Sequence, residues 1–144
     1  FKEGSMKLKL TLLALLVGIS SALADMVVPA NQLPATAQKF ISTHFKGISI
    51  GLVERDMNSF DVVLTDGTKI DFNINGEWTE VDGKYKPIPT GFIPSAVVSK
   101  VQATQQGAQI IEVDREFGGY KFKFTNGMKV YADNNGNILG QKFD

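Results

Sequence analysis

The chain of 144 residues contains no cysteine, one histidine and one tryptophan, and it has as many basic residues as acidic ones. Without cysteine there is no thiol nucleophile, no disulfide and no residue for a lipoprotein anchor. A balanced charge without a basic cluster argues against nucleic acid, whose phosphates require a positive surface. We therefore predict no nucleic-acid partner and a fold that does not depend on oxidation.

The one long apolar run lies near the start, over residues 10–19. It follows Met6 and two lysines and precedes Ala22-Leu23-Ala24, a pattern typical of a secretory signal peptide. The run is shorter than the roughly 20 residues of a membrane span. We expect a non-native leader over 1–5, a signal peptide over 6–24 cleaved between Ala24 and Asp25, and a periplasmic protein without stable membrane insertion.

The sequence matches itself when it is shifted by 60 positions. Val53-Glu54-Arg55-Asp56 falls on Val113-Asp114-Arg115-Glu116, and Asn75-Gly76 falls on Asn135-Gly136. The register needs no gap from residue 33 onward, which indicates two copies of one unit. We expect a loose N-terminal lead over 25–32, a first repeat over 33–82, a connector over 83–92 and a second repeat over 93–144.

Each unit reads as one helix followed by four short strands. Pro34 and Pro94 suit the first turn of a helix, and Gly47 and Gly107 suit its end. Asp-Gly and Asn-Gly pairs are strong hairpin signals. The predicted strands are 48–55, 60–65, 68–74, 77–81, 108–115, 120–125, 128–133 and 137–142. This order predicts an α+β fold of two tandem α-β-β-β-β repeats, an antiparallel sheet with helices packed on one face.

Alternation along the strands assigns the two faces of the sheet. The apolar set should lie under the helices: Phe60, Val62, Leu64, Ile70, Phe72, Ile74, Tyr120, Phe122, Phe124, Val130 and Ala132. Trp78 and its counterpart Ile138 should cap this core. The opposite face is polar, acidic in the first repeat and mostly basic in the second, which leaves it either solvated or available to a partner.

Residues for catalysis are sparse. His44, the only histidine, lies late in a helix between Phe40 and Phe45, where a boundary role is the common one. The carboxylate pairs Glu54/Asp56 and Asp114/Glu116 flank an arginine before a tight turn, which is typical of a charged hairpin end rather than of general acid/base catalysis. We predict that the protein is not an enzyme.

The stretch Asp71 to Trp78, DFNINGEW, opens like a calcium-binding loop, with Asp71, Asn73, Asn75, Gly76 and Asp82 at the ligand positions. It also alternates like a strand that ends in an Asn-Gly hairpin turn. Position 12 would be Asp rather than the bidentate Glu, and no helix flanks the loop. Asp71 falls on Tyr131 in the second copy, whereas the turn is kept. The hairpin is therefore favoured, and we predict no metal site and no cofactor.

The chain resembles a family of exported bacterial proteins called PepSY-like, also described as β-lactamase-inhibitor-like. The matching motifs are Leu33-Pro34, Phe40-Ile41, His44-Phe45, Phe60 to Leu64, Asp66 to Phe72, Asn75 to Asp82 and Ile93-Pro94. The resemblance covers residues 33–144 and implies the tandem unit deduced above. Many relatives continue the tryptophan motif into a cysteine, where this chain has Gly83.

The resemblance implies no active residues, since the family names refer to a shape and to a proposed restraint of peptidases. We predict a periplasmic binding module, monomeric or weakly dimeric, that regulates or inhibits an envelope protein or peptidase. Its contacts on the open sheet face are predicted to be Asp61, Asp71, Lys121, Lys123 and Tyr131. The alternative is a small-molecule or metal-ion sensor that binds between the repeats near Tyr85 and Phe92.

Overall fold

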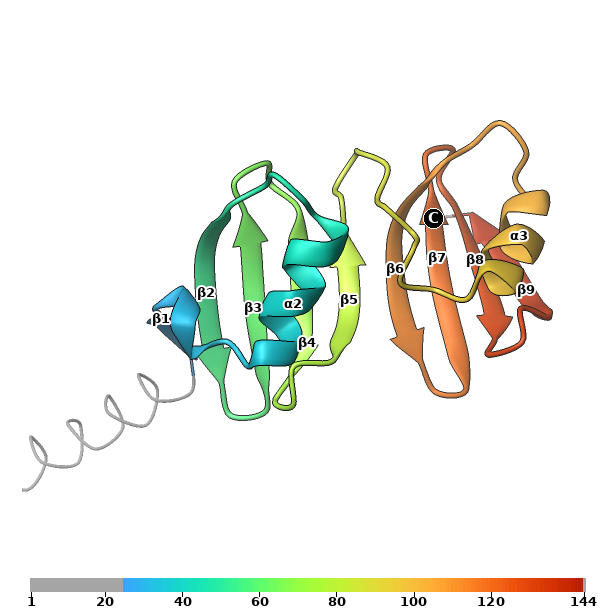
Figure 1. The fold of residues 1–144 in the computed structure, drawn as a ribbon. Helices are drawn as coiled ribbons and strands as arrows, with labels where there is room; N and C mark the ends of the chain where they lie inside the picture. Colours follow the sequence, from blue (N-terminus) through green and yellow to red (C-terminus); the bar gives the residue numbers. More distant parts are fainter. Residues whose placement is uncertain (1–24, 144) are drawn as a thin grey trace, which may run out of the picture.

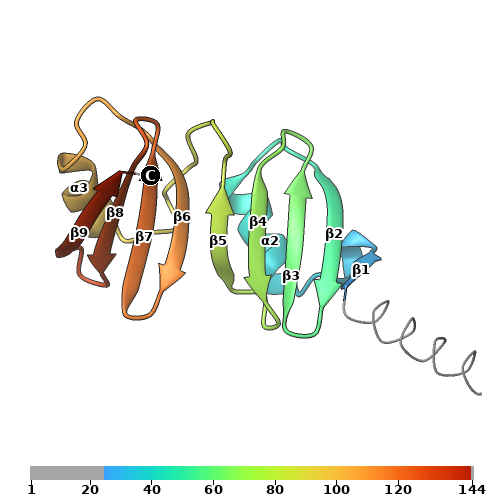
Figure 2. The ribbon, with the colours of Figure 1, turned by 180° about the vertical axis from the view of Figure 1, so that it is seen from behind.

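The computed structural model describes residues 25–143, which form one antiparallel sheet of nine strands in the order β1 to β9. Both α-helices lie on one face of the sheet (Figure 1), and the opposite face is called the open face here (Figure 2). This agrees with the predicted α+β class. The predicted leader, signal peptide and cleavage site lie outside the described residues.

The elements follow one another as the sequence predicts, with two additions at the start, β1 and η1. They are β1 (Asp25–Val28), the 3-10 helix η1 (Ala30–Gln32), α2 (Ala35–His44), β2 (Ile50–Asp56), β3 (Ser59–Leu64), β4 (Lys69–Asn73), β5 (Trp78–Asp82), α3 (Ser95–Ala103), β6 (Ile110–Glu116), β7 (Gly119–Phe124), β8 (Met128–Asp133) and β9 (Ile138–Phe143). We call residues 33–82 the first half and residues 93–144 the second half.

Each α-helix begins directly after a proline, Pro34 or Pro94, which cannot donate a backbone hydrogen bond and suits a helix start. After each α-helix the chain reverses at a glycine with positive φ, which is Gly47 (79°) after α2 and Gly107 (84°) after α3. No helix in the described part of the chain combines the length and the apolar character needed to cross a membrane.

The DFNINGEW stretch is a hairpin. The side-chain oxygen Oδ1 of Asn73 accepts hydrogen bonds from the backbone N–H groups of Asn75 at 3.0 Å and Glu77 at 2.9 Å. Asp133 accepts the equivalent pair in the second half, so Asn and Asp serve the same turn. Gly76, with φ 83°, completes the turn. The Asn73 oxygen that a calcium loop would use is therefore engaged with backbone.

The core lies between the helices and the sheet, where the predicted alternation holds for most positions. Ala37 and Val101 face the sheet from the two helices. The largest fully buried side chains of the core are Phe72, Phe122, Phe124, Leu64, Ile70, Val53, Val62, Val81, Val97, Val101, Val113 and Val130.

The two halves join through the pairing of β5 with β6, a boundary that we call the seam. Val81 lies opposite Val113 in this pairing, and both are fully buried. The connector after β5 stays attached to β6, because Gly83 N–H donates to the Ile111 carbonyl at 2.8 Å and Ile88 N–H to the Ile110 carbonyl at 3.0 Å. The halves are therefore one continuous sheet.

Residues 25–32 are not the loose lead that we predicted. Residues Asp25–Val28 form β1 and pair with β2, so that Val28 lies opposite Val53. Val53 corresponds to Val113, which faces Val81 across the seam. In the first half β1 flanks β2, just as β5 flanks β6 in the second half. Both β2 and β6 are therefore interior strands.

Two apolar residues assigned to the core are exposed instead. Ile74 is 41% exposed, because β4 ends at Asn73 and Ile74 lies in the turn. Ile138 is 37% exposed, whereas its counterpart Trp78 is 5% exposed. Trp78 is covered because β6 and the connector follow its strand, while β9 forms the edge of the sheet in the described chain.

Candidate functional site

The open face carries a row of acidic side chains that crosses five neighbouring strands. Residues of β2, β3, β4, β5 and β6 lie directly opposite one another in the ladder and point away from the helices, as their alternation with buried neighbours requires. Opposite residues in a sheet have Cβ atoms about 5 Å apart. We call this set the carboxylate row: Glu54, Asp61, Asp71, Glu80 and Asp114.

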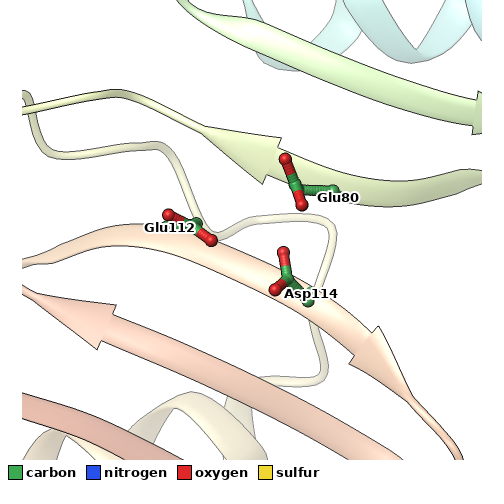
Figure 3. Close-up of side chains that lie close together, drawn as sticks. All are labelled: Glu80, Glu112 and Asp114. Carbon is green, nitrogen blue, oxygen red and sulfur yellow. The ribbon is translucent and has the colours of Figure 1, made fainter. Parts of the chain in front are cut away.

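The row is most crowded at the seam. Oxygen atoms of Glu80 on β5 and of Asp114 and Glu112 on β6 all lie within 4.8 Å of one another. The three side chains converge from the two strands across the seam (Figure 3). Glu112 lies opposite Asp82 and so belongs to the next register position along the strands. All three side chains are half-buried.

Burial and neighbouring carboxylates raise the pKa of Asp71 and Glu80 in the row and of Glu112 beside it. Burial, followed by the charge of Asp114, raises the pKa of Glu80 from 4.5 to about 7. Burial, followed by the charge of Asp61, raises the pKa of Asp71 from 3.8 to about 6. The pKa of Glu112 is also raised, again by burial first and then by Asp114. At neutral pH Glu80 is therefore within its titration range.

Lysines neutralise the row only in part. Lys121 Nζ lies 3.0 Å from Asp114 Oδ2, and this hydrogen bond raises the pKa of Lys121. Lys69 Nζ lies 4.0 Å from Asp71 Oδ1, close enough for an ion pair but too far for a hydrogen bond. Asp71 Oδ1 and Asp114 Oδ1 are buried without a hydrogen-bond partner among the described residues. Two carboxylate oxygens on this face thus lack the bonds that buried oxygens normally make.

Toward β9 the open face changes sign. Lys121 follows Asp114 in the row, and Lys123 lies opposite Glu112. Lys129 on β8 lies opposite Lys123, and Lys142 on β9 lies opposite Lys129. The open face is therefore acidic over β2 to β6 and basic over β7 to β9.

The structure brings most of the predicted contact residues together. Asp61, Asp71, Lys121 and Tyr131 lie in one line across the sheet, and Lys123 lies in the neighbouring line. Sequence reasoning missed the acidic residues that complete the row: Glu54, Glu80 and Asp114. Glu54 and Asp114 were assigned to charged hairpin ends, and Asp114 is aligned with the row only by the pairing of β5 with β6, which is not a local signal.

The two residues predicted to hold a ligand between the halves lie in different surroundings. Tyr85 is 92% exposed on the connector. Phe92 packs against Trp78 with ring centroids 5.0 Å apart, and against Phe40 at 4.9 Å and His44 at 5.4 Å. Phe92 therefore belongs to an aromatic cluster on the helix side of the seam, and Tyr85 does not. His44 is the boundary residue that its sequence position indicated.

Comparison with known families gives one match that spans most of the chain. A family model described as "Putative beta-lactamase-inhibitor-like, PepSY-like" matches residues 23–62 and 58–140. A comparison with functionally curated proteins gave no match.

Solved structures from Bacteroides are similar over nearly their whole length. A "putative periplasmic protein of unknown function" from Bacteroides vulgatus is 32% identical, with a TM-score of 0.77, over 83% of this chain and 99% of that one. A second "putative periplasmic protein" from the same organism is also 32% identical, with a TM-score of 0.76, over 82% of this chain and 96% of that one. A "putative calcium-regulated periplasmic protein" from Bacteroides thetaiotaomicron is 28% identical, with a TM-score of 0.76, over 82% of this chain and 96% of that one.

Proposed function

This chain belongs to the PepSY-like family, and we propose that it is a non-enzymatic periplasmic module that binds a basic surface of a protein partner through the carboxylate row. The observation that carries this proposal is the placement of five acidic residues opposite one another on five neighbouring strands. Like charges directly opposite one another destabilise a sheet. Lysine or arginine side chains of a partner would donate hydrogen bonds to Asp71 Oδ1 and Asp114 Oδ1, which have no hydrogen-bond partner among the described residues.

The partner that we propose is an envelope protein or peptidase that the module restrains. The family description names inhibitor-like proteins, which supports this direction. The contact surface is a sheet built before binding, so little conformational entropy is lost when a partner docks. The basic area over β7 to β9, with Lys121 and Lys123, would meet acidic groups on the same partner and fix its orientation.

The location and the tandem build are part of the same proposal. Similar solved proteins are described as periplasmic, which supports export through the predicted signal peptide. We take the two halves as copies of one unit, joined so that the seam falls within the carboxylate row, between Glu80 and Asp114. A partner that binds this row would therefore contact both copies at once.

Affinity capture from an envelope extract of the source bacterium tests this function. At pH 8, where Asp71 and Glu80 are mostly ionised, the immobilised mature chain is expected to retain a partner, and the double variant Asp71→Asn, Glu80→Gln is expected to lose it, because the row then carries nearly two fewer charges. Salt should weaken the capture by screening.

A matched control separates the row from the overall charge. The double variant Ser42→Lys, Ser99→Lys changes the net charge by the same two units on exposed positions of α2 and α3, opposite the open face. It should retain the partner as wild type does. Equal capture by the row variant and wild type would rule out the carboxylate row as the binding surface.

Binding of a divalent cation at the seam is a second candidate function. The oxygens of Glu80, Glu112 and Asp114 are close enough to share one ion, and Asp114 Oδ1 has no hydrogen-bond partner among the described residues. Calcium takes six to eight oxygen ligands from carboxylates and water. A similar solved protein is described as calcium-regulated. None of these three residues is among the candidate oxygen ligands of the calcium-like stretch, which were Asp71, Asn73, Asn75 and Asp82.

Thermal unfolding with and without calcium tests the cation candidate. If the ion binds, a concentration ten times the Kd should stabilise the protein by about 1.4 kcal/mol, or roughly 5 °C in Tm. Glu112→Gln should abolish the shift. Glu116→Gln, on the same strand but outside the cluster, should keep it. A Tm that calcium leaves unchanged in wild type would remove this candidate and leave the protein-binding proposal standing.

A further inference from the structure

A cavity lies on the helix side of the seam, on the face of the sheet opposite the carboxylate row. Its volume is about 340 Å³, within the range of small-molecule sites. One wall comes from α2 and the other from the β4–β5 hairpin and from β6. The lining includes Lys39, Phe40, His44, Glu77, Trp78 and Arg115. We call this the seam pocket.

The seam pocket has a rigid aromatic base. The rings of Trp78 and Phe92 meet edge to face at 5.0 Å, and Phe40 meets Phe92 at 4.9 Å and Phe72 at 5.6 Å. Trp78 is 5% exposed and Phe72 is fully buried, so the base is anchored in the core. Such a surface offers a flat apolar contact at little cost in side-chain entropy.

Positive charge predominates at the rim. The guanidinium of Arg115 lies 4.3 Å from the centre of the Trp78 ring, and Lys39 lies on the exposed side of α2. Glu77, the acidic residue of the lining, already accepts a hydrogen bond from Asn73 Nδ2 at 3.0 Å. Burial lowers the pKa of His44, so its imidazole is neutral at pH 7. An apolar base beside two permanent cations favours an anion with an apolar body.

Comparison of the two halves separates this pocket from the shared framework. Gly76 and Gly136 are kept, and both approach the helix of their own half closely. Among the ring-bearing and charged lining residues, Arg115 is kept as Arg55, but the others change at the 60-residue offset: Lys39 corresponds to Ser99, Phe40 to Lys100, His44 to Thr104 and Trp78 to Ile138. Because Arg115 comes from the second half, the full set exists only at the seam.

We propose that the seam pocket binds a small organic anion with a ring-sized apolar body, such as an aromatic carboxylate or sulfonate. The apolar body packs against Phe40 and Trp78, and the anionic group reaches Arg115 and Lys39. This assigns a ligand class to the site between the halves that the sequence placed near Phe92. It is independent of the carboxylate row, so either proposal can fail alone.

Fluorescence titration with 8-anilinonaphthalene-1-sulfonate tests the proposal, because Trp78 is the only tryptophan of the chain and reports from the pocket itself. We expect saturable quenching of Trp78 at one probe per chain. N-phenyl-1-naphthylamine has the same rings without the sulfonate and should bind at least about tenfold more weakly, since hydrogen bonds to charged groups contribute about 1.5 kcal/mol or more. Equal affinity for both probes, or no saturable quenching, would overturn the proposal.

Two variants locate the anionic contact. Arg115→Gln should weaken sulfonate binding at least about tenfold and leave binding of the neutral probe nearly unchanged. Arg55→Gln is the matched control, because Arg55 holds the corresponding position in the first half, 5.6 Å from the Phe60 ring and away from the pocket. Lys39→Gln, an exposed helix substitution that should not disturb folding, provides the second test of the rim. If neither Arg115→Gln nor Lys39→Gln weakens sulfonate binding, the site is not the seam pocket.

Discussion

Gly83→Ala is expected to lower the free energy of unfolding by about 3 kcal/mol. A Cβ at this position would lie 2.2 Å from the carbonyl oxygen of Lys86 and 2.8 Å from Cγ2 of Ile88. The backbone cannot easily shift away, because Gly83 N–H donates to Ile111 and Lys86 N–H donates to the Gly83 carbonyl at 3.0 Å.

Chemical denaturation measures this effect, and Gly140→Ala is the matched control. Gly140 lies on β9 with no atom within 4 Å of an added Cβ, so its replacement should change stability by less than about 1 kcal/mol. Both variants should keep the denaturant slope of wild type, which reports the surface exposed on unfolding. A loss at Gly83 no larger than that at Gly140 would contradict the close packing of the connector against β6.

The double variant Asp71→Asn, Glu80→Gln is expected to be about 2 kcal/mol more stable than wild type at pH 8, after a discount for solvent screening of these half-buried groups. Their pKa values are raised in the folded state, to about 6 and about 7. The folded protein therefore holds these protons more tightly than the unfolded chain. In wild type the resulting stability is present below about pH 4 and is lost as the pH rises to about 7.

Unfolding by denaturant at a series of pH values checks this difference. The amides do not titrate, so the gap between the variant and wild type should close below about pH 4 and be fully open above about pH 7. A variant that is less stable than wild type at pH 8 would show that the row stabilises the fold. The row would then need no partner to explain it.

Local signals predicted most of the fold. The hairpins follow from residues close in the chain: Asp-Gly and Asn-Gly pairs set the turns, and Asn73 or Asp133 binds the turn backbone that follows it. Alternation correctly placed residues such as Phe72 and Phe122 in the core. Pattern and structure agree at these positions because one buried face fixes the register of a strand.

The failures concern positions that depend on distant neighbours. Ile138 follows an Asn-Gly turn as Trp78 does, yet no strand follows β9 in the described chain, so Ile138 stays exposed. Residues Asp25–Val28 form a strand because they pair with the backbone groups at the edge of β2, which no other strand covers. Neither fact can be read from the residues themselves.

The candidate site shows the same division. Asp61 and Asp71 were found because a short hairpin places them on one face. Asp114 joins the row only across the seam, between strands separated by the connector and a helix, so local hairpins could not predict its place. Glu54 and Glu80 lie opposite Asp61 and Asp71 in hairpins, but the alternation was not extended to their strands. The register between the halves thus decides that separate acidic residues form one row.

The most direct test of this function is an NMR titration of the side-chain carboxyl carbons of Asp71 and Glu80 in the folded protein. The carboxylate row is proposed as a binding surface because its charges are crowded and incompletely neutralised. The expected result is a pKa of about 6 for Asp71 and about 7 for Glu80. Titration of both groups near their ordinary values of 3.8 and 4.5 would show that the row is not crowded, and would contradict the proposed function.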